Sequence, residues 1–356
     1  MELESHVTAR GPAGERRISP WLALALPTLA LLAAAPARAE VPLPEPRPTA
    51  APATAASSPA KSDLDRKPAK ELFGARKLPA ALTARSIGLY AKGCLAGAAP
   101  LSIDGPAWQA MRLSRNRTWG HPTLISTLEK LATRVKAETK WPGLLVGDIS
   151  QPRGGPMLTG HASHQIGLDA DIWLNPMPGR RYSAREREEI SAKSVANAKF
   201  TDVGKEWTPE HIKVIRAAAT MPGVERVLVN PVIKKALCRE AKGDRSWLAR
   251  VRPYWGHHYH MHIRMACPKD SPNCRPQDPV PADDGCGAPL DWWLKQVKAP
   301  DVPPPPKVPP RPKPPMTMAA LPDECRSVLL APDTGTAQAL TPAPTGQDTP
   351  VPPTPQ

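Results

Sequence analysis

The sequence predicts an α+β fold with one folded core, and three observations support this prediction. Two stretches carry apolar residues at helical spacing, and four short runs read as strands. The 48 prolines gather near the two ends of the 356-residue chain, which leaves a core of roughly 225 residues at 73–297, within the size of one domain. Helices mixed with short strands, without an internal repeat, are typical of the α+β class.

Two helices are predicted from apolar residues at helical spacing. The first is HPTLISTLEKLATRVKAET at 121–139, where His121 stands at the helix entry. The second is TPEHIKVIRAAATM at 208–221, which opens with a capping threonine followed by proline at the first helical position. His211, in its first turn, is expected to be structural. The four strand-like runs are GLLVGDIS (143–150), GLDADIWL (167–174), VERVLVNP (224–231) and HYHMHIRM (258–265).

The N-terminus has the order of a cleaved secretory signal. Basic residues that include Arg16 and Arg17 precede an apolar run at 21–36, and the small-residue sequence ARA ends at Ala39, where cleavage is expected. A membrane anchor is the alternative, but the run is short and Pro27 interrupts it. The arginine pair also suggests twin-arginine export. With 1–39 removed, no membrane span is expected in the mature, exported chain.

Proline-rich segments flank the predicted core on both sides. Residues 40–72 are rich in Pro, Ala and Ser without apolar periodicity, so they predict a disordered or polyproline-like linker. Residues 298–356 form a second proline-rich segment. Within it, LPDECRSVLLAP has Cys325 beside apolar residues, which predicts that this part of the tail returns to the core.

Cysteines and charge indicate the compartment. Six cysteines follow the signal without a C-x-x-C pair, and an even number in an exported chain favours disulfides, with fifteen possible connectivities. The net charge of +14 suits a polyanionic partner, either nucleic acid or an anionic cell envelope. Export favours the envelope, because no nucleic-acid motif is present and aromatic residues make up only 4% of the chain. We therefore expect no nucleic-acid partner. The sequence does not indicate an oligomeric state.

The first histidine cluster lies in GHASHQIGLDADIWL, residues 160–174. Strand alternation from 168 to 174 gives one apolar face and one face with two carboxylates, which a solvent-exposed face would also explain. His164 and Asp171 would be roughly 23 Å apart in an extended chain, so they share a metal only if the chain folds back. Gly160 and Gly167 permit such a loop. His161 is the third candidate ligand of this stretch.

The second cluster is WGHHYHMHIRM, residues 255–265. Alternation places His260 and His262 on one strand face, where one can bind a metal while the other acts on substrate. These two stretches hold six of the nine histidines, which favours a metal site over structural histidines. Imidazole and carboxylate ligands suit Zn²⁺, and three protein ligands with an open position indicate a catalytic site, for which amide hydrolysis is the natural chemistry. No H-E-x-x-H is present.

The motif H-x-x-G-x-x-x-D (164–171), followed about ninety residues later by H-x-H (260–262), resembles the metallopeptidases that include lysostaphin and the D-alanyl-D-alanine peptidases. The strings PRGGPMLTGHASHQIGLDADIWL, VNPVIKKALC, DRSWLARVRPYWGHHYHMHIRMACP and DGCGAPLDWW are similar to the penicillin-insensitive murein endopeptidases over most of 80–295. The resemblance implies a periplasmic zinc enzyme on a small antiparallel sheet surrounded by helices. Its substrate would be the D-alanyl to meso-diaminopimelyl cross-links of peptidoglycan.

The resemblance also implies residue roles. His164, Asp171 and His262 would bind zinc, and His260 would be the catalytic base or an oxyanion partner. His161 and His257 would lie close by, with a metal contact from His161 still open. It further implies the disulfides Cys94–Cys325, Cys238–Cys286 and Cys267–Cys274.

Some points stay open at this stage. Alternation from His260 would place His258 on the metal face, whereas the resemblance favours His257, and a bulge near Gly256 would reconcile the two. Arg153 is expected either to grip a substrate carboxylate or to lie on the surface. The alternative functions are a D-alanyl-D-alanine carboxypeptidase or dipeptidase on the same ligands, and a cell-wall binding module without activity.

Overall fold

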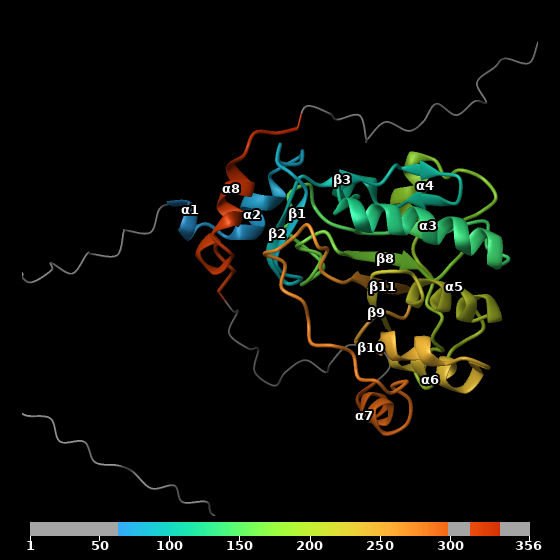
Figure 1. Cartoon of the computed structure of the whole chain (residues 1–356). Coiled ribbons are helices and arrows are strands. Elements are labelled where there is room, and N and C mark those ends of the chain that lie inside the picture. The colour runs from blue at the N-terminus through green and yellow to red at the C-terminus, as the bar shows by residue number, and fades with distance from the viewer. Residues whose placement is uncertain (1–62, 298–313, 335–356) are drawn as a thin grey trace, which may run out of the picture. The chain divides into compact units, whose positions relative to one another are not determined.

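The computed structural model describes residues 63–297 and 314–334, all of which belong to one compact unit (Figure 1). The predicted signal at 1–39, linker residues 40–62 and the rest of the proline-rich tail lie outside the described residues. Within the described ranges, no helix combines the length and apolar character needed to cross a bilayer.

The main sheet has seven strands in the order β10-β9-β11-β8-β7-β5-β4. Its antiparallel centre, β8–β11–β9, carries the predicted site, and the parallel pairs β9–β10 and β5–β7 extend it into a mixed sheet. Asp171 of β8 lies directly opposite His262 of β11 in the strand register. The strand bounds are β4 Asp104–Gly105, β5 Trp108–Ala110, β7 Leu144–Val146, β8 Asp169–Trp173, β9 Val224–Val229, β10 Val251–Pro253 and β11 His260–Met265. All four predicted strand runs are present, and the α+β class is confirmed.

Helices pack against this sheet and fill the core. Both predicted long helices form: α3 (Pro122–Glu138) and α5 (Pro209–Ala219) contribute Leu128 and Ile215 to the main hydrophobic cluster. His211 is structural, as expected: its Nδ1 accepts from the Thr208 amide at 3.0 Å, and its Nε2 donates to the Leu174 carbonyl at 2.8 Å. The remaining elements of this part are α4 (Ala184–Glu189), α6 (Pro231–Glu240), α7 (Ala288–Gln296), the 3-10 turns η1 (Leu113–Arg115) and η2 (Ser246–Arg250), and the short pair β3 (Ala99–Pro100) and β6 (Trp119–Gly120).

A second, smaller core joins the two ends of the described chain. The C-terminal helix α8 (Glu324–Leu330) lies beside α2 (Ala69–Gly74) and the hairpin of β1 (Arg85–Leu89) and β2 (Lys92–Ala96) (Figure 1). The predicted linker therefore ends before residue 72, because α1 (Asp63–Arg66) and α2 are helical and Phe73 is fully buried. The 3-10 turn η3 (Met318–Ala320) completes this layer. The Cys94–Cys325 disulfide ties α8 to β2, so the tail returns as expected.

Arg153 anchors this returning tail, which corrects both expectations for it. Its side chain is wholly buried, and Nη1 donates to the carbonyls of Val328, Leu329 and Ala331 at 2.7–2.9 Å. Nη2 pairs with Asp333 at 2.6 Å. The guanidinium thus caps the carboxyl end of α8, where backbone carbonyls lack partners within the helix. Arg153 is neither a surface residue nor available to a substrate.

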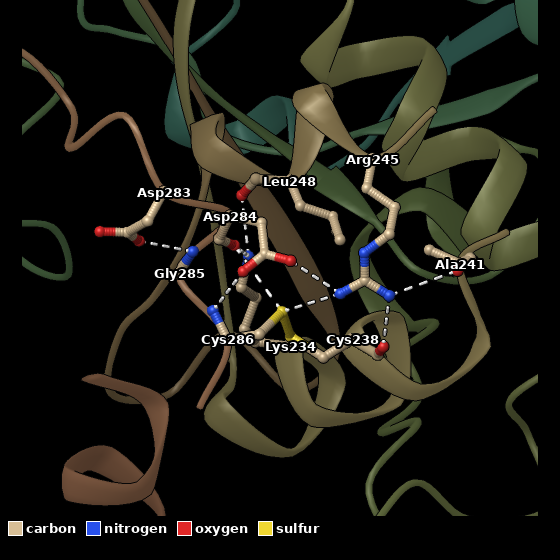
Figure 2. The surroundings of a disulfide bond; sticks show 9 residues. All are labelled: Lys234, Cys238, Ala241, Arg245, Leu248, Asp283, Asp284, Gly285 and Cys286. Carbon is tan, nitrogen blue, oxygen red and sulfur yellow. Dashed lines mark hydrogen bonds and ion pairs between the residues drawn. A yellow bond between two sulfur atoms is a disulfide. The ribbon is translucent and has the colours of Figure 1, made fainter. Parts of the chain in front are cut away.

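The other two disulfides hold loops beside the main core. Cys267 pairs with Cys274, and Cys238 of α6 pairs with Cys286, just before α7. Figure 2 shows that the loop around Cys286 is also held by buried Lys234, whose Nζ donates to the carbonyls of Leu248 and Asp284 at 2.8 and 2.5 Å. The carboxylate of Asp284 accepts from Arg245 at 2.8 Å. The three pairs are those that the family resemblance implied.

Candidate metal centre and active site

A loop at 160–168 folds the chain back and brings His164 to Asp171. The turn uses left-handed backbone at Gly160 (φ 87°), Gly167 (φ 70°) and His164 itself (φ 65°). Replacing Gly167 with any other residue would destabilise the loop, because a Cβ there would lie 2.4 Å from a methyl group of Leu95. The amide of His164 donates to Asp169 Oδ2 at 2.9 Å, which fixes the end of the loop on β8.

Three donor atoms converge where β8 meets β11. His164 Nε2 is 3.2 Å from His262 Nδ1 and 3.5 Å from Asp171 Oδ1, and His262 Nδ1 is 3.4 Å from Asp171 Oδ1. Ligands about 2.1 Å from a tetrahedral zinc ion lie about 3.4 Å from one another, so this triangle has the right size. All three side chains are buried, at 0–7% exposure.

The outer nitrogen of each of these histidines is already occupied. His164 Nδ1 donates to the carbonyl of Ile149 at 2.6 Å, and His262 Nε2 donates to Asp169 Oδ1 at 2.8 Å. In neutral imidazoles the inner nitrogens therefore present lone pairs toward each other and toward Asp171 Oδ1. That oxygen is buried and has no hydrogen bond of normal geometry among the described residues. Such a group of acceptors is favourable only with a proton or a cation between them, so the residues fit a bound metal ion.

The charges around the triad support this interpretation. Burial alone would raise the pKa of Asp171, but the neighbouring His260 and His164 outweigh it and hold the pKa well below its usual range. Burial lowers the pKa of His262, yet the carboxylate of Asp169 overcomes this and raises it. Asp169 in turn pairs with Arg264 at 2.6 Å. The sequence left Asp169 unassigned, and its place directly opposite Arg264 in the β8–β11 register was the missing information.

His161 lies beside the triad. Its Nε2 lies 3.4 Å from Asp171 Oδ2 and 3.0 Å from Asp148 Oδ2. His161, His164 and Asp171 offer ligand atoms within 4.8 Å of one another, a possible His-His-Asp metal group. Asp148 was not identified from the sequence, although an acid two residues after the end of β7 was a usable signal. Burial would raise its pKa, but the His161 hydrogen bond and the charges of Arg117 and Arg115 lower it to about 2.

His260 and His257 border the same centre. The Nε2 of His260 is 3.6 Å from Asp171 Oδ2, and its ring lies 4.8 Å from that of His257 between centroids. Burial lowers the pKa of His260 to about 4, partly offset by Asp171, and burial with the nearby His260 lowers that of His257 to about 3. Both imidazoles are therefore neutral at pH 7 in the arrangement described.

Strand alternation misplaced the residues before His260. Strand β11 begins at His260, and both Gly256 (φ 67°) and His257 (φ 51°) have left-handed backbone, so the alternation does not extend back to them. His257 lies close to the centre, as the resemblance implied, with its ring centroid 5.8 Å from that of His262. His258 is partly buried, with Nδ1 2.9 Å from the hydroxyl of Ser194.

A pocket of ≈ 340 Å³ opens beside the triad. Its lining includes four residues described above and seven others: Asp148, His161, Asp171 and His260, with Arg112, Arg115, Gly147, Trp173, Ser191, Ala192 and Tyr259. A neutral histidine, the candidate metal group and two arginines thus line the same pocket.

Comparison with known proteins identifies the family of this chain. The family model described as penicillin-insensitive murein endopeptidase matches residues 86–330. Penicillin-insensitive murein endopeptidase from Pectobacterium atrosepticum is 43% identical over 244 residues, covering 68% of this chain and 86% of the relative. The protein of that name from Haemophilus influenzae is 42% identical over 255 residues, covering 70% and 84%. This chain therefore belongs to the penicillin-insensitive murein endopeptidase family.

Proposed function

We propose that the protein is an exported zinc DD-endopeptidase that hydrolyses the D-alanyl to meso-diaminopimelyl cross-links of peptidoglycan. The observation that carries the proposal is the triangle of donor atoms from His164, Asp171 and His262, with sides of 3.2–3.5 Å. Family membership supports the murein substrate, since relatives carry the name murein endopeptidase.

The same three side chains would hold the zinc ion, with His161 as a neighbour bound to Asp148. A zinc ion held there would supply Lewis-acid polarisation of the scissile carbonyl and would lower the pKa of its bound water to about 7. Asp169 and the carbonyl of Ile149 orient the two histidine rings through the nitrogens that face away from the centre.

His260 is the residue best placed to move protons. It lies in the pocket, it is neutral at pH 7, and its Nδ1 is buried without a hydrogen-bond partner among the described residues. We assign it the role of accepting a proton from the attacking water and returning one to the leaving diaminopimelyl nitrogen. His257 donates through Nδ1 to the carbonyl of Trp255 at 2.6 Å, which leaves its Nε2 lone pair available beside His260.

The periplasm is the proposed location. A signal at 1–39 would export the chain, and three disulfides suit an oxidising compartment. The net charge of +14 would favour association with an anionic cell wall.

Digestion of purified cross-linked muropeptide dimers tests the proposal. Mass spectrometry should show conversion to monomers with zinc present, and a chelator should stop it. Loss of terminal D-alanine with the cross-link intact would instead identify a D-alanyl-D-alanine carboxypeptidase. Binding of murein without any cleavage would identify a non-catalytic module, and dimers that survive with zinc would refute the endopeptidase assignment.

A further inference from the structure

Arg112 is a cation in the pocket that no described residue neutralises. It lines the pocket that contains Asp171 and His260, and its guanidinium has no hydrogen bond or ion pair with another described side chain. The other pocket arginine differs, because Arg115 pairs with Asp148 at 3.0 Å. Asp148 is also shared with Arg117 at 2.8 Å. The acidic side chains of the pocket therefore already have partners, and the positive charge of Arg112 is available to a ligand.

The local fold presents Arg112 to the pocket rather than leaving it as a loose surface side chain. Its backbone is left-handed (φ 58°, ψ 46°), at the entry to η1, and its amide donates to the carbonyl of Arg187 at 3.1 Å. The guanidinium carbon lies 5.8 Å from the ring centroid of Trp173, a buried residue of β8. Stacking on an aromatic face leaves the edge donors of the guanidinium free for a planar, bidentate acceptor.

We infer that Arg112 is the specificity residue that binds the carboxylate next to the scissile bond on its amine side. This inference rests on the proposed function. In the cross-link, the nitrogen of the scissile amide is attached to the D-centre of diaminopimelate, and that carbon bears a free carboxylate. The acyl side is D-alanine, which offers only a methyl group. A pocket guanidinium that has no ion pair among the described residues, beside the candidate metal group, therefore matches the amine side and sets the direction in which the peptide lies.

The prediction is tested with two forms of one substrate. Cross-linked dimers are prepared with the D-centre carboxylate either free or converted to the carboxamide, and kcat/KM is measured for wild type, Arg112→Gln and Arg112→Lys. Because a hydrogen bond to a charged group contributes about 1.5–3 kcal/mol, wild type should prefer the free acid by about tenfold to a hundredfold. Arg112→Gln should cleave both forms at the rate wild type shows on the carboxamide, so the preference disappears. Arg112→Lys should retain part of the preference for the free acid, because lysine keeps the positive charge but cannot form the bidentate hydrogen bonds of a guanidinium.

A surface variant and a binding measurement complete the design. Arg185→Gln, whose side chain is 83% exposed, should keep the wild-type preference. Calorimetry also measures the affinity for the amine-side product peptide in its acid and carboxamide forms. The difference between the two affinities reports on Arg112 without any cleavage. If wild type cleaves neither dimer but binds the acid form more tightly through Arg112, the proposed activity fails and the assignment of Arg112 stands. If Arg112→Gln keeps the preference of wild type in both measurements, the assignment of Arg112 is overturned.

Discussion

Asp169 Oδ1 lies 2.8 Å from Nε2 of His262, and this contact decides which nitrogen of His262 faces the metal centre. The carboxylate holds the Nε2 proton, so Nδ1 points with its lone pair toward His164 and Asp171. Arg264, 2.6 Å away, keeps Asp169 ionised in a site without solvent exposure. A residue outside the proposed ligand set thus orients one of its histidines.

Asp169→Asn should weaken zinc binding by about 10- to 100-fold, because the amide accepts the His262 proton less strongly and can present the wrong group. Zinc affinity is measured by competition with a chromophoric chelator. Asp291→Asn, an exposed change in α7, is the matched control and should bind zinc like wild type. Unchanged affinity in Asp169→Asn would show that Asp169 does not orient His262.

His260→Ala and His262→Ala should separate catalysis from metal binding, although both residues lie on the same face of β11. His262→Ala removes a member of the donor triangle and should lose both zinc and activity. His260→Ala should still bind one equivalent of zinc while kcat falls by at least about 10²-fold, the usual contribution of a general base. Zinc content is measured by elemental analysis of the dialysed proteins. Loss of zinc in His260→Ala would place His260 among the ligands instead.

Arg153→Met should lower the free energy of unfolding by at least about 3 kcal/mol, because two buried carbonyls and one partly buried carbonyl lose a charged donor. Urea denaturation with the disulfides intact measures the loss. KM for muropeptide dimers should stay the same, since the side chain contacts the tail and is wholly buried. A raised KM with unchanged stability would restore the idea that Arg153 grips substrate.

Lys234 should make the protein more stable as the pH rises from 7 to 9. Burial lowers its pKa from 10.5 to about 7 in the folded state, helped by the charge of Arg252. Between these two values the unfolded chain carries a proton that the folded chain lacks, so raising the pH favours the folded state, by at most about 1.4 kcal/mol per pH unit. Below pH 7 Lys234 is protonated in both the folded and the unfolded state, so it no longer makes the stability depend on pH.

Lys234→Met is the matching variant for this pH dependence. Its absolute stability will differ, because the carbonyls of Leu248 and Asp284 lose their donor. The informative quantity is the slope of unfolding free energy against pH between 7 and 9, which should be flatter in Lys234→Met. Equal slopes in the two proteins would exclude Lys234 as the titrating group.

Much of the fold was predictable because local patterns encode it. The α3 and α5 helices follow from apolar spacing and caps, and β8, β9 and β11 from short apolar or alternating runs. The alternative explanation of GLDADIWL, a solvent-exposed carboxylate face, is wrong, since Asp169 and Asp171 are 0% and 5% exposed. Alternation identifies two faces of a strand, but which neighbours cover each face depends on distant segments.

The sequence by itself determined the α+β class, the family and the group of residues that form the candidate site, because donor-bearing side chains stand at distinctive spacings within glycine-containing loops and short strands. Only the tertiary structure decided how they meet. Pairing β8 with β11 sets Asp171 opposite His262, ninety-one residues later in the chain. The same packing buries Arg153 under the tail, couples Asp169 to His262 and leaves Arg112 without an ion pair among the described residues, since burial and charge pairing depend on contacts between segments distant in sequence.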